Sequence, residues 1–280
     1  MDKTMLTARN YYSREANKAY FSVSQVKGLM HCPAAAMAEL NGTYYQEKTV
    51  PLLVGGYVDA YFSGESDEFI KANPEIFNAR TGELKAEFKK AKDIINRLMR
   101  DDLVKRIASQ SDTQKIVTGN IAGYPFKAKL DFWLDDNATT QIATDYPDLS
   151  EMLYADGAII DLKVMKDFQP IFVPGGGRQH FIEAWQYDLQ LAVYQELMRQ
   201  QIGSKVPCYI LAATKEHAIG MELFRVEQDV LDQRLDELVE RLDELNAIKV
   251  GKTKAIGCGD CQYCRLTKRL TGAVSIEGEE

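Results

Sequence analysis

Two short segments of the sequence each place an acidic side chain on the polar face of a strand, and the second adds a lysine. The first spans residues 126–133 and carries Asp131, and the second spans residues 158–164 and carries Asp161 and Lys163. Because side chains alternate between the two faces of a strand, Asp161 and Lys163 point the same way. If the strands are neighbours, we expect the three charged side chains to converge on one spot.

The same alternation predicts the apolar faces of the two strands. One face of the first strand comprises Phe126, Ala128, Leu130 and Phe132, and one face of the second comprises Ala158, Ile160, Leu162 and Val164. Lys127 and Lys129 are expected beside Asp131 on the polar face.

Two carboxylates and a lysine at one spot could hold a divalent cation and use it against a phosphate. Mg²⁺ takes oxygen ligands, usually one or two protein carboxylates together with water and substrate phosphate. Such a metal lowers the pKa of a bound water and stabilises the charge that builds up on an attacked phosphate. The lysine could orient the attacking water. The competing interpretation is a solvated strand face with ordinary surface charges.

A helical segment further along the chain strengthens the chemical interpretation. Residues 181–199 have a period of 3.6, with an apolar side made of Ile182, Trp185, Leu189, Ala192 and Val193. A different stripe, at offsets of four, three and four, comprises Glu183, Tyr187, Gln190 and Tyr194. Gln and Tyr suit contacts with phosphate or a held water, although a solvated face with half-buried tyrosines is an alternative.

Together these motifs resemble the PD-(D/E)XK nuclease superfamily, in the branch of RecB-type, RecE-type and lambda-type exonucleases. The motifs that carry the resemblance are Asp131 in a hairpin strand, the D-x-K element Asp161-Leu162-Lys163, and the Q-x-x-x-Y helix from Gln190 to Tyr194. The chain is more specifically similar to the phage-type exodeoxyribonuclease VIII (RecE-like) PD-(D/E)XK-like family, from about residue 22 to about residue 270.

The resemblance implies an α/β fold with a restriction-endonuclease-like core, in which helices flank a mixed central β-sheet. It implies that Asp131, Asp161 and the backbone carbonyl of Leu162 ligate Mg²⁺ or Mn²⁺. The implied catalytic residues are Asp131, Asp161, Lys163, Gln190 and Tyr194. The branch also has an upstream G-x-x-x-H motif, and here it corresponds to Gly55 and Asp59, with aspartate in place of histidine. Asp59 is therefore a candidate further metal ligand.

The function implied by the resemblance is a metal-dependent DNA exonuclease that resects duplex ends for phage-type recombination by single-strand annealing. It further implies a RecT-type annealing protein as partner and a homo-oligomeric ring around DNA. Two alternatives stay open: a non-catalytic DNA-binding or assembly factor on a nuclease fold, and a structure-specific endonuclease.

Length and composition agree with one compact nuclease domain. The 280 residues are 45% hydrophobic and 27% charged, which is ordinary for a globular protein. We expect an N-terminal arm over residues 1–20, the nuclease domain over 21–270 and a tail over 271–280. The absence of a run of about 18 apolar residues, and of an apolar core in the first residues, predicts a cytoplasmic protein with no membrane segment.

The net charge of −7 is unevenly distributed along the chain. Residues 80–129 contain twelve Lys or Arg against six Asp or Glu, and residues 246–270 contain six against one. The acidic excess lies mainly in 135–161 and 227–244. A local basic track suits phosphate binding whatever the overall charge, although a solvated helix face explains the lysines near residue 90 equally well.

The remaining pattern predicts the elements around these motifs. We expect helices over 24–40 (capped by Ser24), 52–62, 83–109 and 231–245, a hairpin over 116–134 that turns near Gly123, and strands over 208–214 and 221–226. Residues 135–157 are expected to form an acidic loop or an insertion, and residues 174–178 a flexible loop before the helix that carries Gln190.

The cysteines form a second pattern. Cys258, Cys261 and Cys264 are spaced by three within the Cys-rich segment 257–265, and Cys208 lies in an apolar run. Thiolates at this spacing suit a soft metal. In relatives such as AddB and the CRISPR adaptation nucleases, an early cysteine joins three C-terminal ones around a [4Fe–4S] cluster, and this resemblance makes Cys32 the fourth candidate ligand. Zn²⁺ is the alternative metal, and a group of thiols without a metal is the third interpretation.

Overall fold

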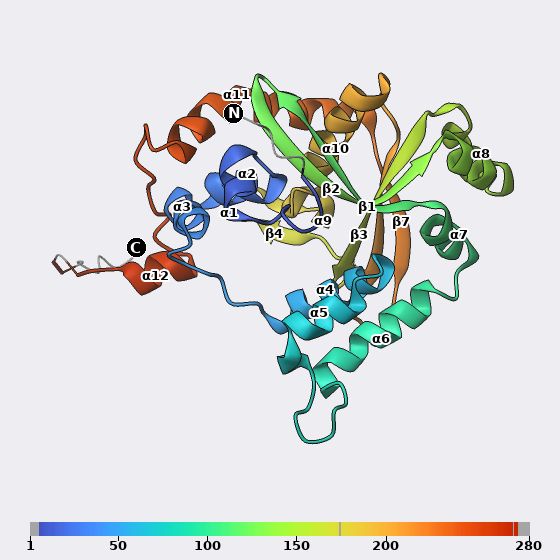
Figure 1. The fold of residues 1–280 in the computed structure, drawn as a ribbon, viewed down its shortest axis with the longest axis horizontal. Helices are drawn as coiled ribbons and strands as arrows, with labels where there is room; N and C mark the ends of the chain where they lie inside the picture. Colours follow the sequence, from blue (N-terminus) through green and yellow to red (C-terminus); the bar gives the residue numbers. More distant parts are fainter. Residues whose placement is uncertain (1–5, 174, 271, 274–280) are drawn as a thin grey trace.

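The computed structural model describes residues 6–173, 175–270 and 272–273. Its centre is a five-stranded mixed sheet with the order β1-β2-β3-β6-β7 (Figure 1). The strands are β1 (Asp112–Ile121), β2 (Tyr124–Asp135), β3 (Gly157–Met165), β6 (Cys208–Thr214) and β7 (Met221–Val226). Only the β3–β6 pair is parallel, and its crossover contains the hairpin of β4 (Ile171–Val173) and β5 (Gly177–Gln179) and two helices.

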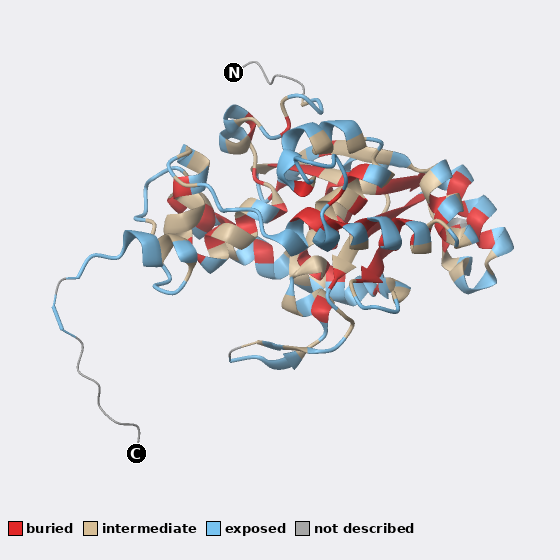
Figure 2. Cartoon of the chain, turned by 90° about the horizontal axis from the view of Figure 1, so that it is seen from below, coloured by how far each residue is buried: buried red, intermediate tan, exposed pale blue. Residues whose placement is uncertain are grey.

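Helices cover both faces of this sheet. One face carries α2 (Val23–His31), α10 (Tyr187–Ile202) and α11 (Gln228–Lys249), and the other carries α4 (Val50–Phe62), α6 (Ala86–Leu98), α7 (Asp102–Gln110) and α8 (Asp136–Asp145). Two apolar clusters fill the spaces between sheet and helices, and Figure 2 shows the buried residues on the strands and on the inner sides of the helices. The predicted α/β architecture, a mixed sheet flanked by helices, is confirmed.

Shorter elements complete the chain. They are α1 (Arg14–Ala19), α3 (Pro33–Asn41), α5 (Ser66–Ala72), α9 (Phe181–Ala184), α12 (Gln262–Thr267), and the 3₁₀ segments η1 (Pro74–Ile76) and η2 (Pro147–Tyr154). Of the predicted arm, residues 6–20 are described, and they contain α1. The predicted tail over 271–280 lies outside the described residues, apart from residues 272 and 273.

The first predicted helix is divided at Cys32. Ser22, not Ser24, caps α2 by accepting a hydrogen bond from the backbone N–H of Gln25. Pro33 then starts α3, and Cys32 before it has the extended angles φ −150° and ψ 92°. Proline disfavours the helical conformation in the residue that precedes it, which explains the break. Cys32 is left buried in the corner between the two helices.

Three other sequence predictions were wrong in detail. The helix expected over 83–109 is two helices, because Asp101 caps a new helix by accepting a hydrogen bond from Val104 N–H. The acidic stretch 135–157 is not a loop but contains α8, which Asp135 caps, and η2. The helix expected over 181–199 is interrupted at Gln186, whose φ is +53°. Glu183 on α9 therefore leaves the predicted stripe.

The β2 strand changes face near its middle. Phe126, Ala128 and Leu130 pack in the cluster on the α10 side, as predicted, but Phe132 packs in the cluster on the α4 side. The β1–β2 register omits the pair that would join Gln114 to Asp131, and Gln114 has φ +54°. This local break in β1 removes the strict alternation on which the prediction for Phe132 depended.

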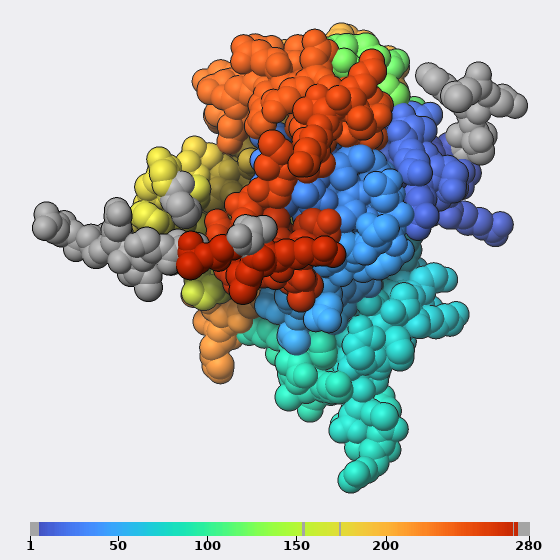
Figure 3. All heavy atoms as spheres, turned by 90° about the vertical axis from the view of Figure 1, so that its left-hand side faces the viewer, coloured from blue at the N-terminus to red at the C-terminus, as the bar shows by residue number. Residues whose placement is uncertain are grey.

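The C-terminal segment packs against helices from the N-terminal part of the chain. Figure 3 shows the C-terminal segment lying over the N-terminal helices, and α12 packs against α3. Among the described residues, no helix combines the length and apolar character that a membrane crossing requires.

Candidate active site and thiolate site

Asp161 and Lys163 lie on the same face of β3, as the strand period predicted. Asp161 is 1% exposed, and its carboxylate forms an ion pair with the Lys163 ammonium. Leu162 and Ile160 point to the opposite cluster. Burial lowers the pKa of Lys163, but the carboxylates of Asp161 and Asp131 outweigh that effect and raise it above its ordinary value. The lysine is therefore a stable cation at neutral pH.

Asp131 reaches the same place because β2 and β3 separate. Their paired register begins at Asp135–Gly157 and ends at Phe132–Ile160, so Asp131 and Asp161 would form the next pair. Instead, the Asp131 carboxylate accepts a hydrogen bond of 2.8 Å from the backbone N–H of Leu162. Burial, and then the neighbouring Asp161 carboxylate, raise the pKa of Asp131 well above its usual range. One buried and one partly buried carboxylate, together with one lysine, form a site in which a divalent cation fits.

Gln190 and Tyr194 extend the site from α10. The Gln190 amide donates to Asp161 Oδ1 at 2.7 Å and to the Tyr194 hydroxyl at 3.0 Å. The predicted stripe therefore keeps these two residues one turn apart on the face toward β3. Because the amide contacts the carboxylate, Gln190 orients Asp161, and Tyr194 orients Gln190.

Asp59 lies beside this group on α4. Gln114 Nε2 donates to Asp59 Oδ1 at 3.4 Å, and burial raises the pKa of Asp59, while Lys129 and Lys163 oppose that rise. A Cβ at Gly55 would lie 3.9 Å from Val164, which is an ordinary contact. The close approach sits one residue later, where a Cβ at Gly56 would lie 2.8 Å from the Phe69 ring. The absence of a side chain is therefore needed at Gly56, where α4 packs on α5, and not at Gly55, which faces β3.

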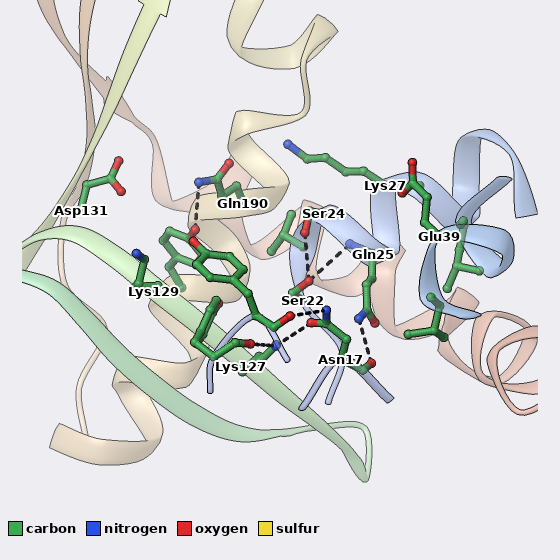
Figure 4. A pocket seen from close by; sticks show the side chains of 18 of the residues that line it. Asn17, Ser22, Ser24, Gln25, Lys27, Glu39, Lys127, Lys129, Asp131 and Gln190 are labelled. Carbon is green, nitrogen blue, oxygen red and sulfur yellow. Dashed lines mark hydrogen bonds between the residues drawn. The ribbon is translucent and has the colours of Figure 1, made fainter. Parts of the chain in front are cut away.

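The charged residues around Asp131 and Asp161 border two hollows of different size. The first, about 450 Å³, lies between β2, α10 and the N-terminal helices, and Figure 4 shows Lys129, Asp131, Gln190 and Lys27 around it. The second, about 1110 Å³, is bordered by Lys163, Trp185, Tyr187 and Lys215. Asp59 and Asp131 line both hollows. A polymer could therefore contact the site from two sides.

The four cysteines predicted to bind a metal lie together in the structure. Cys32 and Cys258 are in contact although 226 positions separate them in the sequence. Their sulfur atoms are all within 4.8 Å of one another. Cys32 Sγ is 3.6 Å from the sulfurs of both Cys261 and Cys264. Hydrogen bonds from the backbone N–H groups of Cys261 and Asp260 lower the pKa of Cys258 to about 6. Cys208 is buried in β6, away from this group, as predicted.

Sequence patterns did not single out Lys27 or Gln114, both of which border the site. Lys27 lies on α2, more than a hundred residues from Asp131 in the chain, and Gln114 stands at an irregular position in β1. Neither belongs to a motif, so no local signal marked them.

The comparisons with known proteins agree with this geometry. A sequence model of the family described as a PDDEXK-like domain of unknown function (DUF3799) matches residues 22–144 and 149–267. No curated protein matches the chain. A crystal structure described as that of a "putative exonuclease" from Eubacterium rectale is 36% identical, covers 97% of this chain and 97% of its own, and superposes with a TM-score of 0.85.

Proposed function

Because the chain belongs to the family described as a PDDEXK-like domain of unknown function, we propose that it is a divalent-metal-dependent nuclease that hydrolyses DNA. The observation that carries the proposal is the bond from Leu162 N–H to Asp131, which holds one carboxylate beside Asp161 and Lys163 where β2 and β3 separate. A solvated strand face would not bury these groups.

In this proposal Asp131 and Asp161 hold Mg²⁺ or Mn²⁺, with the Leu162 carbonyl and Asp59 as further oxygen ligands. The metal, when bound, would activate water and neutralise charge on the attacked phosphate. The Lys163 ammonium would orient the attacking water and stabilise the developing negative charge. Gln190 would keep the Asp161 carboxylate in its binding orientation through the 2.7 Å bond. Tyr194 would in turn hold the Gln190 amide.

We propose duplex DNA ends as the substrate and exonucleolytic resection as the reaction. The similarity to a protein described as an exonuclease supports this. The resemblance noted in the sequence suggests a role in phage-type recombination by single-strand annealing, with a RecT-type partner, a homo-oligomeric ring around DNA and 5′ to 3′ polarity. The site itself supports hydrolysis of a phosphodiester rather than any one of these finer points.

One assay tests the proposal. Linear and circular duplexes of the same sequence, with a label at the 5′ or the 3′ end, are incubated with Mg²⁺ or with EDTA. We expect Mg²⁺-dependent loss of the linear duplex and no cutting of the circle. Cutting of the circle would identify an endonuclease instead, and binding without cutting of either substrate would identify a non-catalytic DNA-binding factor.

The four cysteines are proposed to bind one metal centre that joins the ends of the chain. Tetrahedral Zn²⁺ with Zn–S bonds of about 2.3 Å places its sulfurs about 3.8 Å apart, close to the 3.6 Å contacts of Cys32. A [4Fe–4S] cluster must fit four irons between the thiolates, which requires a wider spacing. The observed spacing favours a single zinc ion, and the iron–sulfur cluster is the competing outcome.

A further inference from the structure

Lys27 projects from α2 toward the active site, across an aromatic ring from Lys163. Its Nζ donates to the backbone carbonyl of Trp185 at 2.9 Å and lies 5.2 Å from the centre of the Tyr187 ring. Lys163 Nζ lies 5.0 Å from the centre of the same ring. One tyrosine is thus flanked by two ammonium groups, of which only Lys163 is paired with a carboxylate.

The surroundings of Lys27 leave its charge poorly compensated. Burial, and then the charge of Lys163, lower the pKa of Lys27 to about 8, while Asp161 and Asp188 only partly oppose this. Within the part of the chain that the structure describes, no carboxylate forms an ion pair with Lys27. A half-buried ammonium with a carbonyl and a ring as its partners is costly unless an anion binds beside it.

The hollow in front of Lys27 leads to the catalytic carboxylates. Lys27, Gln190 and Asp131 line the same space of about 450 Å³ (Figure 4). Tyr12 lies at its rim, 70% exposed, with the Lys129 ammonium 5.2 Å from its ring centre. A nucleic acid strand that reaches Asp131 through this hollow would present its phosphates to Lys27 and its bases to an exposed ring.

We propose that Lys27 binds a phosphate of the DNA strand being cut, adjacent to the scissile phosphate, on the Gln190 side of the catalytic centre. This inference rests on the proposed nuclease function and specifies where its substrate strand lies. Lysine binds phosphate as a compact point charge, so the contact fixes position without reading sequence. The phosphate is either internal to the strand or the terminal phosphate of its end, and both have the same chemistry.

The test compares Lys27→Met and Lys27→Arg with the wild type and with Lys71→Met, an exposed lysine on α5 outside both hollows. In steady-state cleavage of linear DNA, Lys27→Met should raise KM about tenfold or more while kcat changes much less, because a charge-assisted contact to substrate is lost. Lys27→Arg should recover most of the loss, and Lys71→Met should match the wild type. The same assay is run on strands that carry a 5′-phosphate or a 5′-hydroxyl. If Lys27→Met raises KM only for the 5′-phosphorylated strand, Lys27 binds the terminal phosphate, and if it raises KM for both strands, Lys27 binds an internal phosphate.

A binding measurement separates this inference from the nuclease proposal. Fluorescence anisotropy in EDTA, where no cutting occurs, gives Kd for single-stranded DNA over a series of KCl concentrations. Lys27→Met should make the plot of log Kd against log salt shallower by about 0.7, one phosphate contact, with an unchanged thermal unfolding midpoint. An unchanged slope and KM in Lys27→Met would overturn the role of Lys27 even if the wild type cuts DNA. A wild type that binds but does not cut would overturn only the nuclease proposal.

Discussion

The Asp131 carboxylate accepts a hydrogen bond from the backbone N–H of Leu162, at 2.8 Å, one residue beyond the last paired position of β2 and β3. This bond stands where the next backbone pair of β2 and β3 would have formed, and it holds the Asp131 carboxylate close to Asp161. Separation of the strands, rather than their pairing, therefore brings the charged residues together.

Asp161→Ala should abolish cleavage and leave the fold intact. The substitution removes the carboxylate that Lys163 and Gln190 contact. DNA binding should be retained or become tighter, because a negative charge near the phosphate is lost. Cleavage of labelled linear DNA, anisotropy and thermal unfolding give the three measurements, and Asp236→Ala on the exposed side of α11 is the matched control. Wild-type activity in Asp161→Ala would contradict the site.

Lys163→Met should reduce kcat by roughly 10²-fold or more, since it keeps the aliphatic stem and removes the charge that faces the reacting phosphate. Lys163→Arg should recover only part of the activity, because a planar guanidinium presents its donors differently. Single-turnover cleavage with saturating enzyme measures the chemical step directly. A Met variant within a few-fold of the wild type would place the lysine outside the reaction.

Asp59→Asn should lower activity about tenfold and raise the Mg²⁺ concentration needed for half-maximal rate. The reason is its position beside Asp131 at the border of both hollows. A Mg²⁺ titration of the initial rate provides the readout. Asp67→Asn, on the neighbouring helix α5, should behave as the wild type. If the Mg²⁺ dependence of Asp59→Asn is unchanged, Asp59 does not contribute to metal binding.

Cys258→Ser should release the metal of the thiolate site and lower the thermal unfolding midpoint, because metal binding at such sites is coupled to folding. Elemental analysis of anaerobically purified wild type should give one zinc per chain and a colourless protein. Brown protein with iron and labile sulfide would identify the [4Fe–4S] cluster instead. Cys208→Ala is the control, since Cys208 is buried in β6 and should keep the metal. Full metal content in Cys258→Ser would contradict the four-cysteine site.

Lys249 should make the folded state more stable as the pH rises. Its ammonium bonds to the Tyr20 carbonyl and the Gln25 amide, yet burial, and then Lys127, lower its pKa from 10.5 to about 7. Between these two values the unfolded chain binds more protons, so the free energy of unfolding increases with pH in that window, while below it the contribution of Lys249 does not change with pH. Urea unfolding at pH 7 and pH 9 should show a smaller increase in Lys249→Met than in the wild type or in exposed Lys252→Met. Equal increases in all three would refute the assignment.

The sequence predicted those parts of the site that follow from a local period. The two-residue alternation of β3 places Asp161 and Lys163 together, and the turn of α10 aligns Gln190 with Tyr194. In the thiolate group, regular spacing marked Cys258, Cys261 and Cys264, whereas Cys32 was identified only through the resemblance to AddB and the CRISPR adaptation nucleases.

The rest depends on contacts between distant residues. Phe132 changes face next to the break in pairing between Gln114 and Asp131, and nothing in residues 126–133 signals it. Likewise, Lys27 becomes part of the site only because α2 packs beside α10. The helix predicted over 181–199 is interrupted at Gln186, which has a positive φ that non-glycine residues seldom adopt. The sequence does not signal this break, because the helical period of apolar residues continues across it.

The two hollows share Asp59 and Asp131 in their linings, which bears on how the proposed nuclease would release its product. A catalytic centre at the bottom of a blind pocket must release its polymer before each product can escape. Asp59 and Asp131 border both hollows, so under the proposed nuclease function a strand lying in one hollow would leave the other free for the excised fragment. Under that function, successive cuts would need only translation of the strand by one step, which is the geometric condition for processive degradation.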